Sequence, residues 1–237
     1  MELISPRFVV EDNIDGKQIL ANIERYGRTC YKSEGNITPD SAEKFIRMIL
    51  KSGHESVVEH EKVTVRVICD RGVTHEIVRH RIGSYSQEST RYCNYSAGKF
   101  GSGISVIVPP FFQLEAGRKL GVPIPRDFIR ENGQMQFVMD TGEVNEFDVW
   151  LMAMMFSEWA YLTLVNVFGR SPQEARSVLP NSLKTEIVIT YNLREWRHFF
   201  RLRCSKKAHP QMREIAIPLL LEFQSKIPVI FDDIILD

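Results

Sequence analysis

Arginines gather in two short stretches of this chain of 237 residues, which carries no net charge. The first stretch holds Arg79, Arg81 and Arg91. The second holds four arginines: Arg194, Arg197, Arg201 and Arg203. A guanidinium group binds two phosphate oxygens at once, so two such clusters in a neutral chain favour a small polyanion such as a nucleotide. Helix faces on which arginines are solvated or paired with glutamates are the alternative explanation.

The common nucleotide-binding loops are absent from the sequence. Gly98, Gly101 and Gly103 have the wrong order and context for a Gly-x-Gly-x-x-Gly fingerprint, and no Gly-Lys-Ser/Thr loop occurs. Phosphates would therefore have to be bound by side chains.

Histidine spacing argues against a metal site. His75 and His80 are five positions apart, about 140° around a helix axis, so they cannot share a zinc ion as an i,i+4 pair would. His54 and His60 are six apart, which also misses the zinc-protease spacing. We therefore expect no bound metal.

Composition argues against a nucleic-acid-binding protein and against a membrane protein. With 30 basic and 30 acidic residues, no global field attracts a nucleic-acid polymer or an anionic membrane. No run approaches the ~18 apolar residues that span a bilayer, and Met1 to Glu11 does not resemble a targeting segment. The four cysteines form no Cys-x-x-Cys pair: Cys30, Cys69, Cys93 and Cys204. A cytoplasmic protein with reduced thiols is expected.

The elements that position the arginines follow from hydrophobic periodicity. Helical spacing covers residues 38–53, with Thr38 as a possible cap, and a broad apolar stripe covers 147–162. Strict alternation over 62–69 and 183–191 predicts two half-buried strands. Asp70 can cap a helix that runs toward Arg79. Asn192, with Glu195 at the capping-box position, can cap the helix that carries the second cluster.

Helix start and stop signals also occur in the C-terminal half. Ser171, Pro172 and Glu174 form a capping box that starts a short helix carrying Arg176. A last helix begins near Pro210, and Pro218 should kink it or end its first half.

Between about residues 96 and 146, glycines and prolines predict loops around one short strand near 104–108, and 111–145 is a possible insertion or lid. The chain lacks the regular strand, helix, strand rhythm of a doubly wound sheet. We expect an α+β fold over residues 1–237, a single domain with a mainly antiparallel or mixed sheet packed with several helices.

The segment from Arg79 to Tyr92 carries the most specific pattern. It reads Arg-His-Arg, seven residues, Ser, then Arg-Tyr after one more residue, and it closely resembles the signature of the flavin-dependent thymidylate synthases. The resemblance covers residues 20–215 and includes further positions: Gly53, His54, Glu55, Ser56, Glu59, His60, Arg176, Leu179, Pro180, Asn192, Arg194, His198, Leu202 and Arg203.

This resemblance implies an enzyme that methylates dUMP to dTMP, with tightly bound FAD as hydride carrier, NADPH as reductant and methylenetetrahydrofolate as carbon donor. It also implies a homotetramer whose active sites combine residues of different subunits. The residues it assigns to FAD are His54, Ser56, Glu59, Arg79, His80, Arg81, Ile82, Gln87, Asn192, Arg194 and His198. The residues it assigns to dUMP are Glu76, Arg79, Gln87, Glu88, Ser89, Thr90, Arg91, Arg176 and Arg203.

Within the dUMP set, Arg91 and Arg176 are assigned to the phosphate and Arg203 to the pyrimidine. Attack by C5 of uracil needs electron density in the ring, and a fixed cation beside the ring carbonyls stabilises that anionic form. Arginine stays protonated and cannot act as the base, so Arg203 is the candidate catalytic residue through electrostatics.

Ser89 and Cys204 are not expected to be nucleophiles. No oriented base can be assigned to Ser89, so we expect it to position dUMP. Cys204 lies in an aromatic-rich helix and is expected to be a packing residue. Glu76 replaces the glutamine common in the family, and its charge would repel a phosphate, so it should accept from a neighbouring arginine or a sugar hydroxyl. His198 occupies a position that varies in the family.

Two rival functions stay open. One is another flavin-linked reductase, or a folate-dependent methyltransferase acting on uracil in RNA. The other is a protein that binds RNA or a nucleotide without chemistry.

Overall fold

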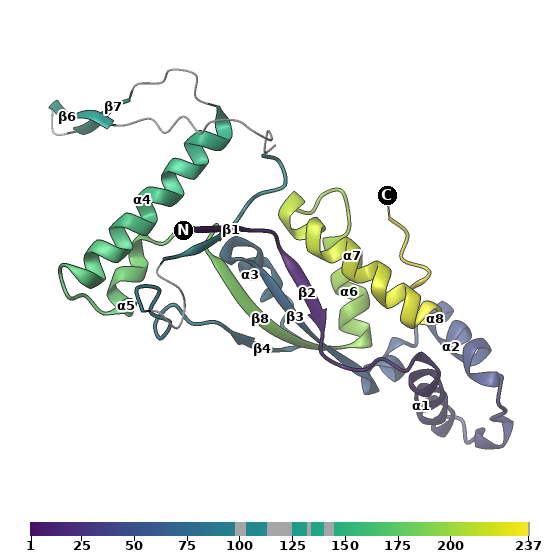
Figure 1. Ribbon diagram of the computed structural model, residues 1–237. Coiled ribbons are helices and arrows are strands. Elements are labelled where there is room, and N and C mark those ends of the chain that lie inside the picture. Colours follow the sequence, from purple (N-terminus) through teal and green to yellow (C-terminus); the bar gives the residue numbers. More distant parts are fainter. Residues whose placement is uncertain (98–102, 113–124, 132–133, 140–144, 237) are drawn as a thin grey trace. The chain divides into compact units, whose positions relative to one another are not determined.

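The computed structural model describes residues 1–97, 103–112, 125–131, 134–139 and 145–236 (Figure 1). These residues form two compact units, each described here by itself. Unit 1 comprises Met1–Ile4 and Ser89–Leu183, and unit 2 comprises Ser5–Glu88 and Lys184–Asp237.

Unit 2 is built on an antiparallel sheet of four strands. In the order β2-β3-β8-β4, these are Arg7–Val10, Lys62–Asp70, Lys184–Asn192 and Ser84–Gln87. The two long central strands pair along their whole length, with Val65 opposite Ile189. Buried residues alternate with partly exposed ones along β8, and along β3 as far as Val67, so one face of the sheet belongs to the core.

Helices complete unit 2. Its helical elements are α1 (Gly16–Thr29), η1 (Glu34–Asn36), α2 (Ser41–Lys51), η2 (Glu55–His60), α3 (Arg71–Ile77), α6 (Leu193–Arg203), α7 (Pro210–Lys226) and α8 (Pro228–Phe231). Trp196 of α6 is fully buried, and its ring stacks on Phe200 and meets Phe223 of α7. Its indole also donates to the carbonyl of Val63 at 3.0 Å. Burying each such ring contributes roughly 1.5–3 kcal/mol and fixes α6 against the sheet.

Unit 1 contains the remaining described elements. These are β1 (Glu2–Ile4), β5 (Ser105–Ile107), β6 (Pro125–Glu131), β7 (Gln134–Met139), α4 (Glu146–Asn166), α5 (Pro172–Ala175) and η4 (Arg176–Val178). β1 and β5 are parallel, and β6 and β7 form an antiparallel pair. Tyr161 of α4 is fully buried against Tyr95 in a small core.

The expected α+β fold with an antiparallel sheet is confirmed, whereas the single domain and the tetramer stay predictions. The helix expected over 38–53 spans Ser41–Lys51, and the expected cap at Thr38 is wrong, because Asp40 holds the N-cap position. The loops expected over 96–146 include the β6-β7 pair. These two strands, which pair antiparallel, were not expected from the sequence. Much of the possible lid at 111–145 lies outside the described residues.

Two further expectations can be compared with the structure. Of the two outcomes expected at Pro218, an end of the helix there is wrong, because α7 continues through it to Lys226. The four cysteines are free, as expected, and no described helix is long and apolar enough to cross a membrane.

Candidate functional site

A pocket of about 400 Å³ lies on unit 2 beside α6. The residues that line it come from η2, the turn before β4, the end of β8 and α6: Glu55, Glu59, Ile82, Asn192, Arg194, Glu195, His198 and Arg201. Its volume is in the range of small-molecule sites. Five of these residues are among those that the family resemblance assigns to FAD: Glu59, Ile82, Asn192, Arg194 and His198.

Helix α6 presents these side chains because of how it begins. The Asn192 side chain caps it by accepting from the Glu195 amide at 2.8 Å. From that start, positions 194, 198 and 201 recur at helical spacing on the exposed face, while Trp196 and Phe200 enter the core. The same amphipathic pattern that anchors the helix therefore directs its polar residues to the pocket.

The pocket contains opposite charges in contact. Arg194 donates to Glu59 at 2.5 Å and lies 3.7 Å from Glu55, which is also 3.5 Å from Arg201. The carboxylate of Glu59 raises the pKa of Arg194. Both arginines are about half exposed, so they remain accessible to an anionic ligand that competes with the glutamates.

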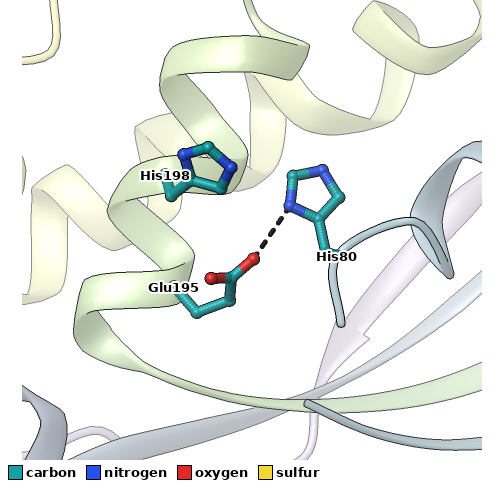
Figure 2. A group of neighbouring side chains, drawn as sticks. All are labelled: His80, Glu195 and His198. Carbon is teal, nitrogen blue, oxygen red and sulfur yellow. Dashed lines mark hydrogen bonds and ion pairs between the residues drawn. The ribbon is translucent and has the colours of Figure 1, made fainter. Parts of the chain in front are cut away.

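His80 forms the buried edge of the site. Its Nδ1 lies 2.9 Å from Glu195 Oε1, and its ring meets that of His198 edge-on at 5.4 Å (Figure 2). Arg203 Nε donates to His80 Nε2 at 3.1 Å. Because an arginine can only donate, Nε2 must be the acceptor and Nδ1 carries the proton that goes to Glu195. Burial, with the charges of Arg203 and His198, lowers the pKa of His80 despite the opposing effect of Glu195.

Arg203 joins the end of α6 to the end of α3. Its Nη1 donates to Glu76 Oε2 at 2.7 Å and its Nη2 donates to the Glu76 carbonyl at 2.9 Å. The sequence-based expectation that Glu76 accepts from an arginine is thus confirmed. The contacts also bring the Arg-His-Arg segment and the second arginine cluster together in one unit.

Two tyrosines hold the turn that carries His80. The Tyr85 hydroxyl donates to the His80 carbonyl and lies 2.7 Å from the Tyr191 hydroxyl, which donates to the Ile77 carbonyl at 3.2 Å. Burial raises the pKa of both hydroxyls, so they stay neutral donors. Gly83 is required nearby, since a Cβ there would lie 2.3 Å from the Tyr191 ring.

His80, Glu195 and His198 offer ligand atoms within 4.8 Å of one another, a set that could hold a metal ion by residue type. Both ring nitrogens of His80 are already bonded, one of them to the cation of Arg203. A second cation at the same nitrogen would be repelled and would have to displace Arg203. The arrangement therefore favours a hydrogen-bonded chain over a metal site.

The remaining residues of the family pattern are distributed over both units. His54, Ser56, Arg79 and Arg81 are exposed on unit 2, whereas Gln87 and Glu88 bond to neighbouring side chains, including that of Lys184. Ser89, Thr90, Arg91 and Arg176 belong to unit 1, where Arg176 donates to Thr90 at 3.4 Å. Their roles stay predictions.

Some features of the site were not foreseen. The capping-box interpretation required the Glu195 carboxylate to accept from the helix start. The carboxylate instead binds His80. Arg201 had been named only as a cluster member and Glu55 only as part of the family pattern. Arg197 is buried in a fork on Asp233, with both contacts at 2.7 Å, so for this arginine the structural explanation is correct.

Burial also decides the case of Cys204. Its thiol belongs to the main hydrophobic core of unit 2, and burial raises its pKa to about 12. A thiol that stays protonated is a poor nucleophile, so the packing role is confirmed.

A family model and two curated relatives assign this chain to the same family. Residues 14–229 match the family described as Thymidylate synthase complementing protein. The flavin-dependent thymidylate synthase of Corynebacterium glutamicum is 30% identical over 246 residues, covering 97% of this chain and 85% of that protein. The protein of the same name from Mycobacterium tuberculosis is 33% identical over 216 residues, covering 90% and 78%.

Two solved structures share the fold. The UMP/dUMP methylase PolB from Streptomyces cacaoi, bound with 5-Br dUMP, has a TM-score of 0.70 at 23% identity, over 98% of this chain and 96% of its own. Thymidylate synthase X from Helicobacter pylori, with FAD and dUMP, has a TM-score of 0.68 at 21% identity, over 96% and 98%.

Proposed function

The chain belongs to the family of flavin-dependent thymidylate synthases, and from this premise we propose that it methylates dUMP to dTMP with FAD, NADPH and methylenetetrahydrofolate. The observation that carries the proposal is the contact of Arg203 with Glu76 and His80, beside a pocket lined by Ile82 and Arg194. These contacts join residues 76–82 to residues 192–203. The joined segments offer guanidinium, imidazole and amide groups, which suit a nucleotide and a flavin.

The pocket residues fit part of FAD. Asn192 offers an amide, Arg194 and Arg201 offer exposed guanidinium groups, and His198 offers an exposed ring beside the apolar side chain of Ile82. These are donors for carbonyl and phosphate oxygens together with surfaces on which a ring can stack. At about 400 Å³ the pocket suits a portion of a dinucleotide. Bound FAD would supply the hydride.

Arg203 has capacity left for the pyrimidine. A guanidinium carries five N–H donors, and three contacts to Glu76 and His80 leave two free. Free donors on a guanidinium held in one orientation can meet a ring carbonyl and stabilise the anionic ring that attacks carbon. Release of the N3 proton is left to solvent, since arginine stays protonated.

We assign the dUMP phosphate to Arg91 and Arg176. Both are exposed, and the 3.4 Å contact between Arg176 and Thr90 places a hydroxyl beside one guanidinium in unit 1. Arginine and hydroxyl donors together suit phosphate oxygens. Within the described residues, the Ser89 hydroxyl accepts a weak 3.3 Å contact from the Arg91 amide and has no base beside it, which fits a positioning role.

Assembly into a homotetramer with shared active sites is part of the proposal. Its support is helix α4, whose exposed side chains include Val149, Phe156 and Trp159. Large apolar side chains exposed together on one helix often mark a protein–protein contact. A cytoplasmic location is supported by the four free cysteines.

The function is tested by incubating the protein with FAD, NADPH, methylenetetrahydrofolate and dUMP and identifying the product by mass spectrometry. The expected product is dTMP in excess over the flavin. A parallel reaction offers transcribed tRNA in place of dUMP. Methylated RNA with unchanged dUMP, or RNA binding by a protein without flavin, would establish one of the rival functions instead.

A further inference from the structure

Glu76 accepts two hydrogen bonds from Arg203, and a lone pair on His80 accepts the third. The Arg203 Nε–H donates to His80 Nε2 at 3.1 Å, and only the tautomer protonated at Nδ1 leaves that lone pair free. With the other tautomer, two N–H groups would face each other at this distance. Orientation of the guanidinium is therefore linked to the position of one proton on a ring that is only 4% exposed.

Glu195 determines which ring nitrogen of His80 carries the proton. Its Oε1 lies 2.9 Å from Nδ1, and the residue is 7% exposed, so it presents a fixed acceptor with little competition from water. We propose that Glu195 is a positioning residue, which holds His80 in the Nδ1–H form so that Nε2 retains Arg203 in the orientation used on the pyrimidine. The inference rests on the proposed function of Arg203.

The titratable groups near the His80 ring come from α6, α3, β4 and β8. Glu195, His198 and Arg203 face it from α6, and Glu76 of α3 acts through Arg203. The hydroxyl of Tyr85 on β4 binds the His80 carbonyl, and the ring of Tyr191 on β8 lies 6.1 Å away. Among these groups, Glu195 is the one whose charge raises the pKa of His80, while burial, Arg203 and His198 lower it.

A dependence on pH follows. Protonation of Nε2 at low pH would remove the acceptor and place a second cation against Arg203, so activity should fall as His80 becomes charged. Removing the charge of Glu195 lowers the pKa of His80 further, so the neutral ring should survive to lower pH. A purely structural glutamate would leave the acid limb of the pH profile where it is.

Three variants test this in the complete protein, with kcat and KM for dUMP measured across pH. Glu195→Gln still accepts from Nδ1–H, so its plateau kcat should stay within about threefold of wild type while the acid limb moves to lower pH. Glu195→Leu should lose about 10- to 100-fold in kcat with little change in KM, because the guanidinium is displaced. His80→Gln keeps an acceptor for Arg203 and should lose the acid limb.

Glu24→Gln is the matched control, because it also removes the charge of a buried glutamate but lies on α1, where Glu24 pairs with Arg28. Its acid limb should match wild type. An unchanged limb in Glu195→Gln or in His80→Gln would overturn the proposal.

A second readout needs no turnover. In protein labelled with ¹⁵N-histidine, the His80 signal, assigned by its loss in His80→Gln, should show a protonated Nδ1 and an unprotonated Nε2 at neutral pH. Protonation at Nε2 would refute the positioning role even in an active enzyme. Absence of dTMP formation together with the expected tautomer would instead refute the proposed function and leave the His80 geometry intact.

Discussion

Replacing Arg203 with alanine removes the cation proposed to stabilise the pyrimidine. The wild-type side chain is only 18% exposed and donates to Glu76 Oε2 at 2.7 Å, to the Glu76 carbonyl at 2.9 Å and to His80 at 3.1 Å. An electrostatic donor of this kind contributes about 2.7–4 kcal/mol to the transition state, so kcat should fall about 10²- to 10³-fold. FAD should be retained, because the pocket lining does not include Arg203.

The same change has a smaller effect on stability. Glu76 is 35% exposed and can be solvated when its partner is lost, so the free energy of unfolding should fall by about 1–2 kcal/mol. For a chain of this size that lowers the thermal midpoint by roughly 2–8 °C. The variant should therefore be folded at assay temperature.

The assay is a single turnover: the bound flavin is reduced with NADPH without oxygen, and its reoxidation is followed after addition of dUMP and methylenetetrahydrofolate. Arg47→Ala is the control, since it removes an arginine that is ion-paired with Asp232 at 2.7 Å but lies on α2, away from the pocket. Its rate should equal that of wild type. A rate within about threefold of wild type for Arg203→Ala would refute the electrostatic role.

Three further predictions follow. Ser89→Ala should keep measurable turnover with a raised KM for dUMP, because in the described part of the chain no base lies beside its hydroxyl, which accepts from the Arg91 amide at 3.3 Å; steady-state kinetics decide this, and complete loss with dUMP still bound would indicate a covalent role. Cys204→Ala should form dTMP at close to the wild-type rate while losing about 1 kcal/mol of stability in urea unfolding, since a buried, protonated thiol only packs; an inactive but folded variant would contradict this. Burial raises the pKa of Asp233, but bonds from Arg197 outweigh it and lower that pKa overall, so the ion pair stabilises the fold above about pH 4 and is lost as pH falls through the folded pKa. The advantage of wild type over Arg197→Met in unfolding free energy should therefore shrink below about pH 4, and a gap independent of pH would show that the pair contributes nothing through charge.

Local sequence patterns were sufficient to predict features that lie within a single strand or helix. The alternation over 62–69 predicts β3, and Asn192 predicts the start of α6, because a strand face and a helix cap are set within a few residues. The pattern of Ser171 and Glu174 likewise forms the expected capping box. Pro218 was misleading because the packed faces of α7 maintain the helix despite the missing donor: Ala216, Leu219 and Leu220 on either side of it are buried.

Contacts between distant segments could not be predicted in the same way. Glu195 satisfies the spacing of a capping box, yet its carboxylate binds a histidine 115 positions earlier in the chain. Arg197 and Arg194 look equivalent in a list of arginines, but one is buried on Asp233 and the other lines the pocket. Helix rotation and the packing of the C-terminal segment decide between them, and neither is encoded in local spacing.

The most direct test of the central claim, that the segments 76–82 and 192–203 together form a flavin-dependent site for dUMP, is the absorption spectrum of the purified protein during turnover. The expected result is a yellow protein whose flavin absorbance is bleached by NADPH and returns only when dUMP and methylenetetrahydrofolate are added. A colourless protein that takes up no FAD, or reduced flavin whose reoxidation ignores dUMP, would contradict it.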